Sequence, residues 1–254
     1  MTLRRQTALS KFSKGTSTEH KNEFVNDYLI FDQGYKPQNR NIMRRLPVYL
    51  VLDTSGSMYG EPIEAVKNGM QILVNALRQD PYALETAYLS VITFDSSAQQ
   101  IVPLSELASF NLPTLSANGG TSLGAALKLV AERAANEVTK STAEVKGDWK
   151  PMVFLMTDGG PTDDWQSGLA EFKQGKFGVV VACAAGAQAD TNVLRQITES
   201  VVTLDTADTA SLQAFFKWVS SSISTGSQKV ESAGKEVAGL DELPPPPPEI
   251  NVVV

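Results

Sequence analysis

The chain has one histidine and one cysteine among its 254 residues. Zinc sites in proteins are usually built from several nitrogen and sulfur ligands, so this composition argues against a typical zinc shell. Cys183 has no second cysteine with which to form an intramolecular disulfide, and its apolar neighbours predict a buried side chain. His20 lies in a polar leader, so a Ser–His nucleophile pair is hard to build in the rest of the chain.

Long apolar runs and an excess of basic charge are also absent. No segment approaches the roughly 20 apolar residues of a membrane span, and the amino terminus lacks the apolar core of a signal peptide. The net charge of −6 argues against general nucleic-acid affinity. No G-x-x-x-x-G-K-S/T loop is present to bind a nucleotide. These absences predict a cytoplasmic protein with neither a membrane nor a nucleic acid as its partner.

The remaining composition predicts one domain with polar segments at both ends. A hydrophobic content of 42% in a chain of this length is enough for one sizeable α/β core. Residues 1–42 have a net charge of +3 and are predicted to be a mobile basic extension, whose apolar patch at 26–32 either docks or makes weak local contacts. The predicted domain covers residues 43–225. A flexible linker and a proline-rich tail are predicted over 226–254.

Apolar segments alternate with amphipathic ones along the predicted domain, which is typical of a doubly wound α/β fold. We predict strands at about 46–53, 84–94, 100–102, 151–157, 177–184 and 200–204. We predict helices at about 61–79, 122–140, 163–174, 190–197 and 209–224. The strand near 100–102 follows a short turn, which indicates an antiparallel hairpin with its predecessor. The expected architecture is a Rossmann-like, mainly parallel six-stranded sheet with one antiparallel edge strand and helices on both faces.

The segment Asp53-Thr54-Ser55-Gly56-Ser57 follows the apolar run that is predicted to be the first strand. Its carboxylate and two hydroxyls alternate along the chain, and Gly56 lets the backbone curl them toward one point. Ligand sites of open α/β sheets lie at the carboxyl ends of strands, which is where this segment falls. The same residue types also form ordinary helix N-caps, so this segment alone leaves both interpretations open.

Two later loops favour the metal interpretation, because each supplies oxygen atoms at the same kind of position. Gly119–Gly124 presents the Thr121 hydroxyl before a predicted helix, and Met156–Asp163 presents Asp158 after a predicted strand. Oxygen-only ligation is what Mg²⁺ prefers, with Mn²⁺ or Ca²⁺ as substitutes. The sequence therefore predicts a magnesium site formed by Asp53, Ser55, Ser57, Thr121 and Asp158.

These motifs resemble the von Willebrand factor A domains, whose metal-ion-dependent adhesion site reads D-x-S-x-S, then a threonine, then an aspartate. The resemblance covers roughly residues 43–225 and rests on DTSGS, GGTSLGAAL and MTDGGPTD in that order. The segments MRRLPVYLVLDTSGSM, ALRQDPYALETAYLSVITF and KGDWKPMVFLMTDG are most similar to the TerY-like bacterial branch, which is associated with tellurite and stress resistance.

The resemblance implies a binding module in which an Asp or Glu of a partner protein completes the coordination of the metal. The TerY-like branch implies a phosphosignalling assembly with a Ser/Thr kinase and a PP2C-type phosphatase of the same gene cluster. An enzyme is the alternative, namely a metal-dependent, phosphatase-like hydrolase that uses the Asp53 loop. Phosphatases of the haloacid-dehalogenase type have a second aspartate where this chain has Ser55, which cannot act as that general acid. We therefore predict a protein that is not an enzyme.

Three residues near the third loop are candidates for partner binding. Trp149 and Trp165 flank the loop, and aromatic side chains of this kind either anchor partners or pack against the domain. Asp163 and its neighbour Asp164 either adjust specificity or bind a second metal through their charge, or they form the N-cap and first turn of a helix.

The proline-rich tail supplies the remaining candidates for partner binding. Five consecutive prolines, which include Pro244, Pro245 and Pro246, favour a stiff polyproline II rod. Ile250 and the valines after it are apolar, which a free tail has no reason to be. The tail is therefore either a solvated linker or a strand that adds to the sheet edge of a partner.

Overall fold

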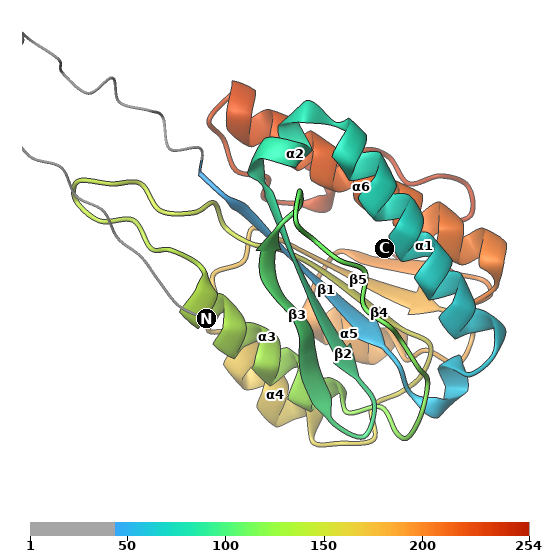
Figure 1. The fold of residues 1–254 in the computed structure, drawn as a ribbon. Coiled ribbons are helices and arrows are strands. Elements are labelled where there is room, and N and C mark those ends of the chain that lie inside the picture. The colour runs from blue at the N-terminus through green and yellow to red at the C-terminus, as the bar shows by residue number, and fades with distance from the viewer. Residues whose placement is uncertain (1–43, 254) are drawn as a thin grey trace, which may run out of the picture. The chain divides into compact units, whose positions relative to one another are not determined.

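The computed structural model describes residues 44–253, in which the strands form one seven-stranded sheet (Figure 1). The strands in chain order are β1 (Leu46–Asp53), β2 (Ala87–Phe94), β3 (Ala98–Glu106), β4 (Met152–Thr157), β5 (Val179–Ala185), β6 (Val201–Leu204) and β7 (Asn251–Val252). The helices are α1 (Glu61–Gln79), α2 (Pro81–Thr86), α3 (Leu123–Glu137), α4 (Trp165–Phe172), α5 (Thr191–Ile197) and α6 (Thr209–Ser232), with short 3-10 turns η1 (Gly56–Met58) and η2 (Leu240–Glu242).

The strands lie in the order β3-β2-β1-β4-β5-β6-β7, so β1 is in the interior of the sheet. β1 pairs in parallel with β2 and with β4, and β4, β5 and β6 continue the parallel arrangement. The chain first builds outward from β1 through β2 and β3, and then resumes on the other side of β1 at β4. This reversal places the topological switch point between the carboxyl ends of β1 and β4.

Helices cover both faces of the sheet, as the sequence predicts. α1, α2 and α6 pack together on one face, and α3 and α4 pack against each other on the other (Figure 1). Every residue of β1 is buried, because its side chains alternate between two cores. Leu50 and Leu52 belong to the core under α1 and α6, whereas Tyr49 and Val51 belong to the core under α3, α4 and α5.

The predicted mainly parallel α/β architecture is confirmed, but the sheet has seven strands where six were expected. β3 is the predicted antiparallel edge strand and pairs with β2. β7 adds a second antiparallel edge at the other side of the sheet, where Val202 pairs with Val252 and Thr203 with Asn251. Two residues have too little pattern to be identified as a strand before the fold places them beside β6.

The expected strand at 84–94 begins later, because its first residues belong to α2. The carboxylate of Asp80 accepts hydrogen bonds from the backbone N–H groups of Tyr82 and Ala83, and Pro81 occupies the first turn. These are strong signals for a helix start, and they override the apolar run that follows.

The carboxyl-terminal segment packs on the domain, which corrects the expectation of a flexible tail from residue 226. α6 continues to Ser232, beyond the predicted domain end at 225. The indole N–H of Trp218 donates a hydrogen bond of 2.8 Å to the Pro244 carbonyl, and Lys229 forms a 2.8 Å ion pair with Glu242. The predicted extension at 1–42 and its apolar patch lie outside the described residues.

Candidate metal centre

The predicted metal ligands lie at the carboxyl end of the sheet, at the switch point between β1 and β4. Asp53 is the last residue of β1, and Asp158 directly follows β4. Ser55 and Ser57 lie in the turn after β1, and Thr121 precedes α3. Because β1 and β4 are adjacent parallel strands, these loops leave the sheet at the same edge.

A hydrogen-bonded chain of oxygen atoms connects the first and third loops. Ser57 Oγ donates to Asp158 Oδ1 at 2.7 Å, and the Oγ atoms of Ser55 and Ser57 are 3.0 Å apart. Ligands at adjacent corners of an octahedron with metal–oxygen distances of about 2.1 Å are themselves about 3.0 Å apart. These two spacings are therefore close to those of neighbouring ligands of one cation.

The Asp53 carboxylate is fully buried and held from two sides. Its Oδ1 accepts the backbone N–H of Ser55 at 2.8 Å, and its Oδ2 accepts the Thr157 hydroxyl at 2.5 Å. Thr157 was missed at the sequence level, because it ends an apolar strand and looks like an ordinary sheet residue. Its position directly before Asp158 is the only signal in the sequence that places it at the site.

Backbone hydrogen bonds join the Thr121 loop to the other two loops. Gly56 N–H donates to the Gly119 carbonyl at 3.0 Å, and Thr162 N–H donates to the Thr121 carbonyl at 2.9 Å. The Thr121 hydroxyl makes no hydrogen bond within residues 44–253, and it lies 3.8 Å from where a Cβ on Gly159 would be. This side chain is therefore buried beside the Asp158 loop with an oxygen that is free to bind a cation.

Gly119 is required by the geometry of the second loop. Its φ of +71° is in the left-handed region, and a Cβ there would lie 2.2 Å from Ser96 Oγ. Ser96 Oγ in turn accepts the backbone N–H of Gly120 at 3.0 Å. The turn after β2 thus fixes the loop that presents Thr121, a contribution that the spacing of the metal motif does not reveal.

Burial raises the pKa of both carboxyl groups above their ordinary range. For Asp53, hydrogen bonds from Ser55 and Thr157 oppose this effect, and the nearby Asp158 adds to it. For Asp158, the hydrogen bond from Ser57 opposes the effect of burial. Neither carboxylate has an ion-pair partner within the described chain. Two buried, uncompensated carboxylates are an environment that a divalent cation would stabilise.

The described residues contain no cluster of three or more Asp, Glu, His or Cys side chains that could hold a metal. A metal site in this part of the chain would therefore need ligands other than these four side-chain types. The five predicted residues offer hydroxyls as well as carboxylates, and this combination suits a hard cation.

Trp149 does not lie at the rim of this site, which corrects the prediction that it flanks the partner-binding face. It is buried in the core and precedes β4, at the opposite end of the strand from Asp158. Its backbone N–H donates to the Arg45 carbonyl, and the Arg44 guanidinium lies 3.5 Å from the ring centroid. The length of β4 separates Trp149 from the loop that it was expected to border.

Asp163 and Trp165 do lie beside the site. The Asp163 carboxylate accepts the backbone N–H groups of Gly124 and Ala125 at 3.0 and 2.9 Å, so it caps α3. Asp164 is the N-cap of α4. Trp165 is half-buried against the core under α3 and α4. The capping interpretation of the two aspartates thus holds, although Asp163 caps a helix that precedes it in the sequence.

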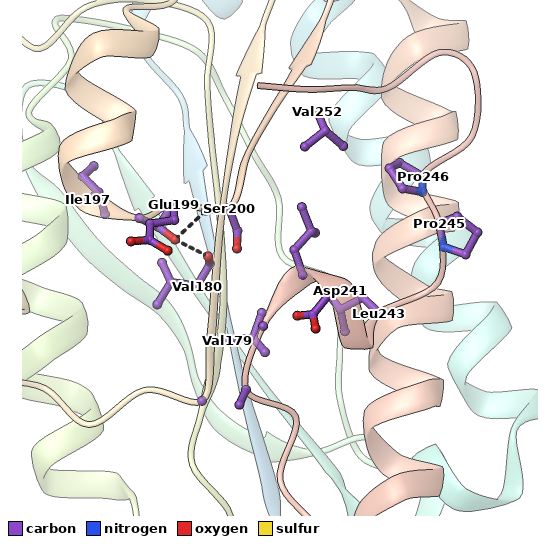
Figure 2. Close-up of a pocket in the computed structure, with 15 residues that line it drawn as sticks. Val179, Val180, Ile197, Glu199, Ser200, Asp241, Leu243, Pro245, Pro246 and Val252 are labelled. Carbon is purple, nitrogen blue, oxygen red and sulfur yellow. Dashed lines mark hydrogen bonds between the residues drawn. The ribbon is translucent and has the colours of Figure 1, made fainter. Parts of the chain in front are cut away.

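The end of the tail packs on the domain instead of standing free for a partner. Ile250 is 5% exposed and belongs to the core under α6, so it is not available as a partner-binding residue. Figure 2 shows Pro245 and Pro246 across a groove of about 970 Å³ from Val179 and Val180 at the start of β5. The expected strand addition thus takes place on the chain's own sheet, through β7.

The sequence matches the von Willebrand factor type A domain over residues 48–218, and the chain belongs to that family. An uncharacterized protein of Synechocystis sp. is 36% identical over 123 residues, which are 46% of this chain and 26% of that protein. The chain therefore spans about a quarter of the length of this relative.

Three similar solved structures share the fold. The von Willebrand factor type A protein of Catenulispora acidiphila has a TM-score of 0.54 at 21% identity, over 72% of this chain and 43% of that one. The pilus adhesin SpaC of Lactobacillus rhamnosus GG has a TM-score of 0.56 at 16% identity, over 72% of this chain and 30% of that one. Proximal thread matrix protein 1 of the mussel byssus has a TM-score of 0.51 at 21% identity, over 70% of this chain and 48% of that one. That structure is described with a zinc-occupied adhesion motif.

No helix in residues 44–253 is both long and apolar enough to cross a membrane. Members of this family are typically modules that bind proteins in a metal-dependent way.

Proposed function

We propose that this domain binds Mg²⁺ through Asp53, Ser55, Ser57, Thr121 and Asp158, and that a carboxylate of a partner protein completes the coordination. The observation that carries the proposal is the chain of oxygens from Asp158 through Ser57 to Ser55, whose spacings of 2.7 and 3.0 Å suit neighbouring ligands of one cation. Mn²⁺ and Ca²⁺ are proposed as substitutes.

The charge balance of the site supports a partner carboxylate as the missing ligand. Asp53 and Asp158 neutralise the two charges of the cation, and the three hydroxyls add no charge. Magnesium prefers six oxygen ligands, so at least one position is open to water or to an incoming carboxylate. Exchange of that water for an Asp or Glu of a partner makes the metal a bridge between the two proteins.

We propose binding in preference to catalysis, and the residue at position 55 supports this choice. Ser55 cannot replace the general acid of a hydrolase, because a hydroxyl does not donate its proton at neutral pH as a carboxyl group does. The hydrolase alternative therefore lacks its general acid.

We propose a setting for this interaction on the strength of the TerY-like motifs in the sequence. The domain acts in the cytoplasm as a scaffold or regulator in a bacterial tellurite- or stress-resistance assembly, with a Ser/Thr kinase and a PP2C-type phosphatase as partners. Trp165 and Pro245 remain proposed contacts, because Trp165 is only half-buried and Pro245 is exposed. Nucleic acid and membrane are not proposed as partners.

Titration calorimetry with Mg²⁺ and affinity capture from the native cytoplasm test the proposal together. Asp53→Ala should abolish metal binding and the capture of partners while the protein remains folded, as judged by circular dichroism. Asp164→Ala is the matched control, because it removes an exposed carboxylate from the same edge of the sheet. This control should bind Mg²⁺ and partners like the wild type.

EDTA and a chain that stops at Gly239 separate the metal site from the tail. Loss of partners with EDTA and with Asp53→Ala supports recognition through the metal. Partners that are retained in EDTA and lost only on truncation would contradict the proposal and assign recognition to the tail.

A further inference from the structure

An exposed aromatic side chain borders the candidate metal centre. Tyr59 lies two residues after Ser57, which places it within about 7 Å of chain from a proposed ligand. Its side chain is 80% exposed, whereas Met58 beside it is fully buried. An aromatic side chain that is turned to solvent next to a binding site is a candidate anchor for a partner.

The local backbone holds Tyr59 in this outward position. Tyr59 N–H donates to the Gly56 carbonyl at 3.2 Å, which closes the 3-10 turn η1. Gly60 then adopts a φ of +90° and directs the chain into α1. Tyr59 is therefore presented on an ordered backbone, and little backbone entropy is lost when its side chain is covered.

Tyr59 forms one wall of a groove of about 410 Å³. Ile63 of α1, Leu115 and Ala117 form the rest of its apolar lining. The backbone N–H of Asn118 donates to the Thr54 carbonyl at 2.8 Å, so this wall is joined directly to the loop of the metal ligands. The groove thus lies beside the loop that carries Ser55 and Ser57, and its volume is large enough for one or two apolar side chains.

The charged residues of the groove define which side chains it accepts. Lys67 is paired with Glu64 at 2.7 Å, and Glu61 accepts hydrogen bonds from the backbone and hydroxyl of Thr209. Glu61 is therefore held in place, and the only cation in the lining is already neutralised. An apolar side chain is compatible with this groove, whereas a second acidic side chain next to the metal-bound carboxylate would be repelled.

We propose that the partner is recognised by an acidic residue with an apolar one within two positions of it, with the carboxylate on the metal and the apolar side chain against Tyr59. This inference rests on the proposed function, because it assigns the second contact of the same interaction. Tyr59 is then a specificity-determining residue that contributes to partner affinity without contributing to metal affinity.

A displayed library of random peptides with one fixed aspartate tests the inference on the full chain. Selections are run in Mg²⁺ and in EDTA on the wild type, on Tyr59→Ala and on Tyr82→Ala. The last is the matched control, because Tyr82 is also exposed, at 40%, but belongs to α2. We expect Mg²⁺-dependent enrichment of apolar residues within two positions of the aspartate, depletion of acidic ones there, and the same result for Tyr82→Ala.

In Tyr59→Ala the apolar preference should disappear, and the affinity of a selected peptide should fall about tenfold, while Mg²⁺ binding stays unchanged. Tyr59→Phe should keep the preference, because it retains the ring. Mg²⁺-dependent binding of aspartate peptides without an apolar preference, or with one that survives in Tyr59→Ala, overturns this inference and leaves the proposed function intact. Selections with no dependence on Mg²⁺ overturn both.

Discussion

At the residue scale, the carboxyl end of the sheet contains aspartates with two different functions. The carboxylates of Asp163, Asp190 and Asp208 accept backbone N–H groups at helix starts, so they cap and stabilise α3, α5 and α6. Asp53 and Asp158 are buried beside serine hydroxyls and cap no helix. The sequence shows the same residue type before a helix in each case. Only the D-x-S-x-S spacing and the later loops with Thr121 and Asp158 distinguish the proposed ligands from the capping aspartates.

Thr157 provides a test of how the site holds its carboxylate. Thr157→Val keeps the shape of the side chain and removes the hydroxyl that donates to Asp53 Oδ2. A hydrogen bond to a charged group contributes about 1.5–3 kcal/mol, so we expect Mg²⁺ affinity to fall roughly tenfold or more by titration calorimetry. Thr157→Ser restores the hydroxyl and should restore the affinity. Equal affinities for all three proteins would show that Thr157 does not position Asp53.

At the element scale, local sequence signals determined most helices and strands. The expected ranges for β1 and α1 agree with the structure at both ends, because an uninterrupted apolar run and a proline-led amphipathic segment are clear local patterns. The largest differences are at 84–86 and in the tail. In the first, the Asp80 cap was overlooked. In the second, the pairing partner of β7 is about fifty residues away, so no local pattern reveals it.

The tail gives a prediction about stability. Ile250→Ala should lower the free energy of unfolding in urea by about 2–4 kcal/mol, because it removes a buried branched side chain from the core under α6. Val252→Ala is the control in the same strand. Val252 is 43% exposed, so its loss should change stability by no more than about 0.5 kcal/mol. Two equally small effects would be incompatible with a packed tail.

At the scale of the whole molecule, the site and the stability of the fold are coupled through buried charge. Burial raises the pKa of both proposed carboxylate ligands. A carboxyl group with a raised pKa in the folded state favours folding only while it is protonated. Its contribution is therefore lost as the pH rises from the ordinary value of 3.8 through the folded-state pKa.

Asp53→Asn tests this coupling by thermal unfolding. In EDTA at pH 7 the variant should have a higher Tm than the wild type, because it removes one of two adjacent buried charges. The difference should shrink as the pH falls toward 3.8, where the wild-type group becomes protonated.

In Mg²⁺ the order of the two proteins should reverse. At a concentration of 100 times its Kd, the metal should stabilise the wild type by about 2.7 kcal/mol and leave the variant unchanged. A variant that is less stable than the wild type in EDTA would mean that Asp53 supports the fold directly. Mn²⁺ and Zn²⁺ in the same assay rank the cations.

Local patterns are enough to predict the alternation of strands and helices, the family, and the five oxygen-bearing residues at one edge of the sheet. Each of these depends on a short segment whose periodicity or spacing has a local physical cause. The burial of Trp149 at the far end of β4, the hydrogen bond from Thr157 to Asp53 and the pairing of the tail with the sheet are visible only in the folded structure. These features depend on contacts between segments far apart in the chain, and the free energy of such contacts exists only once the core has formed.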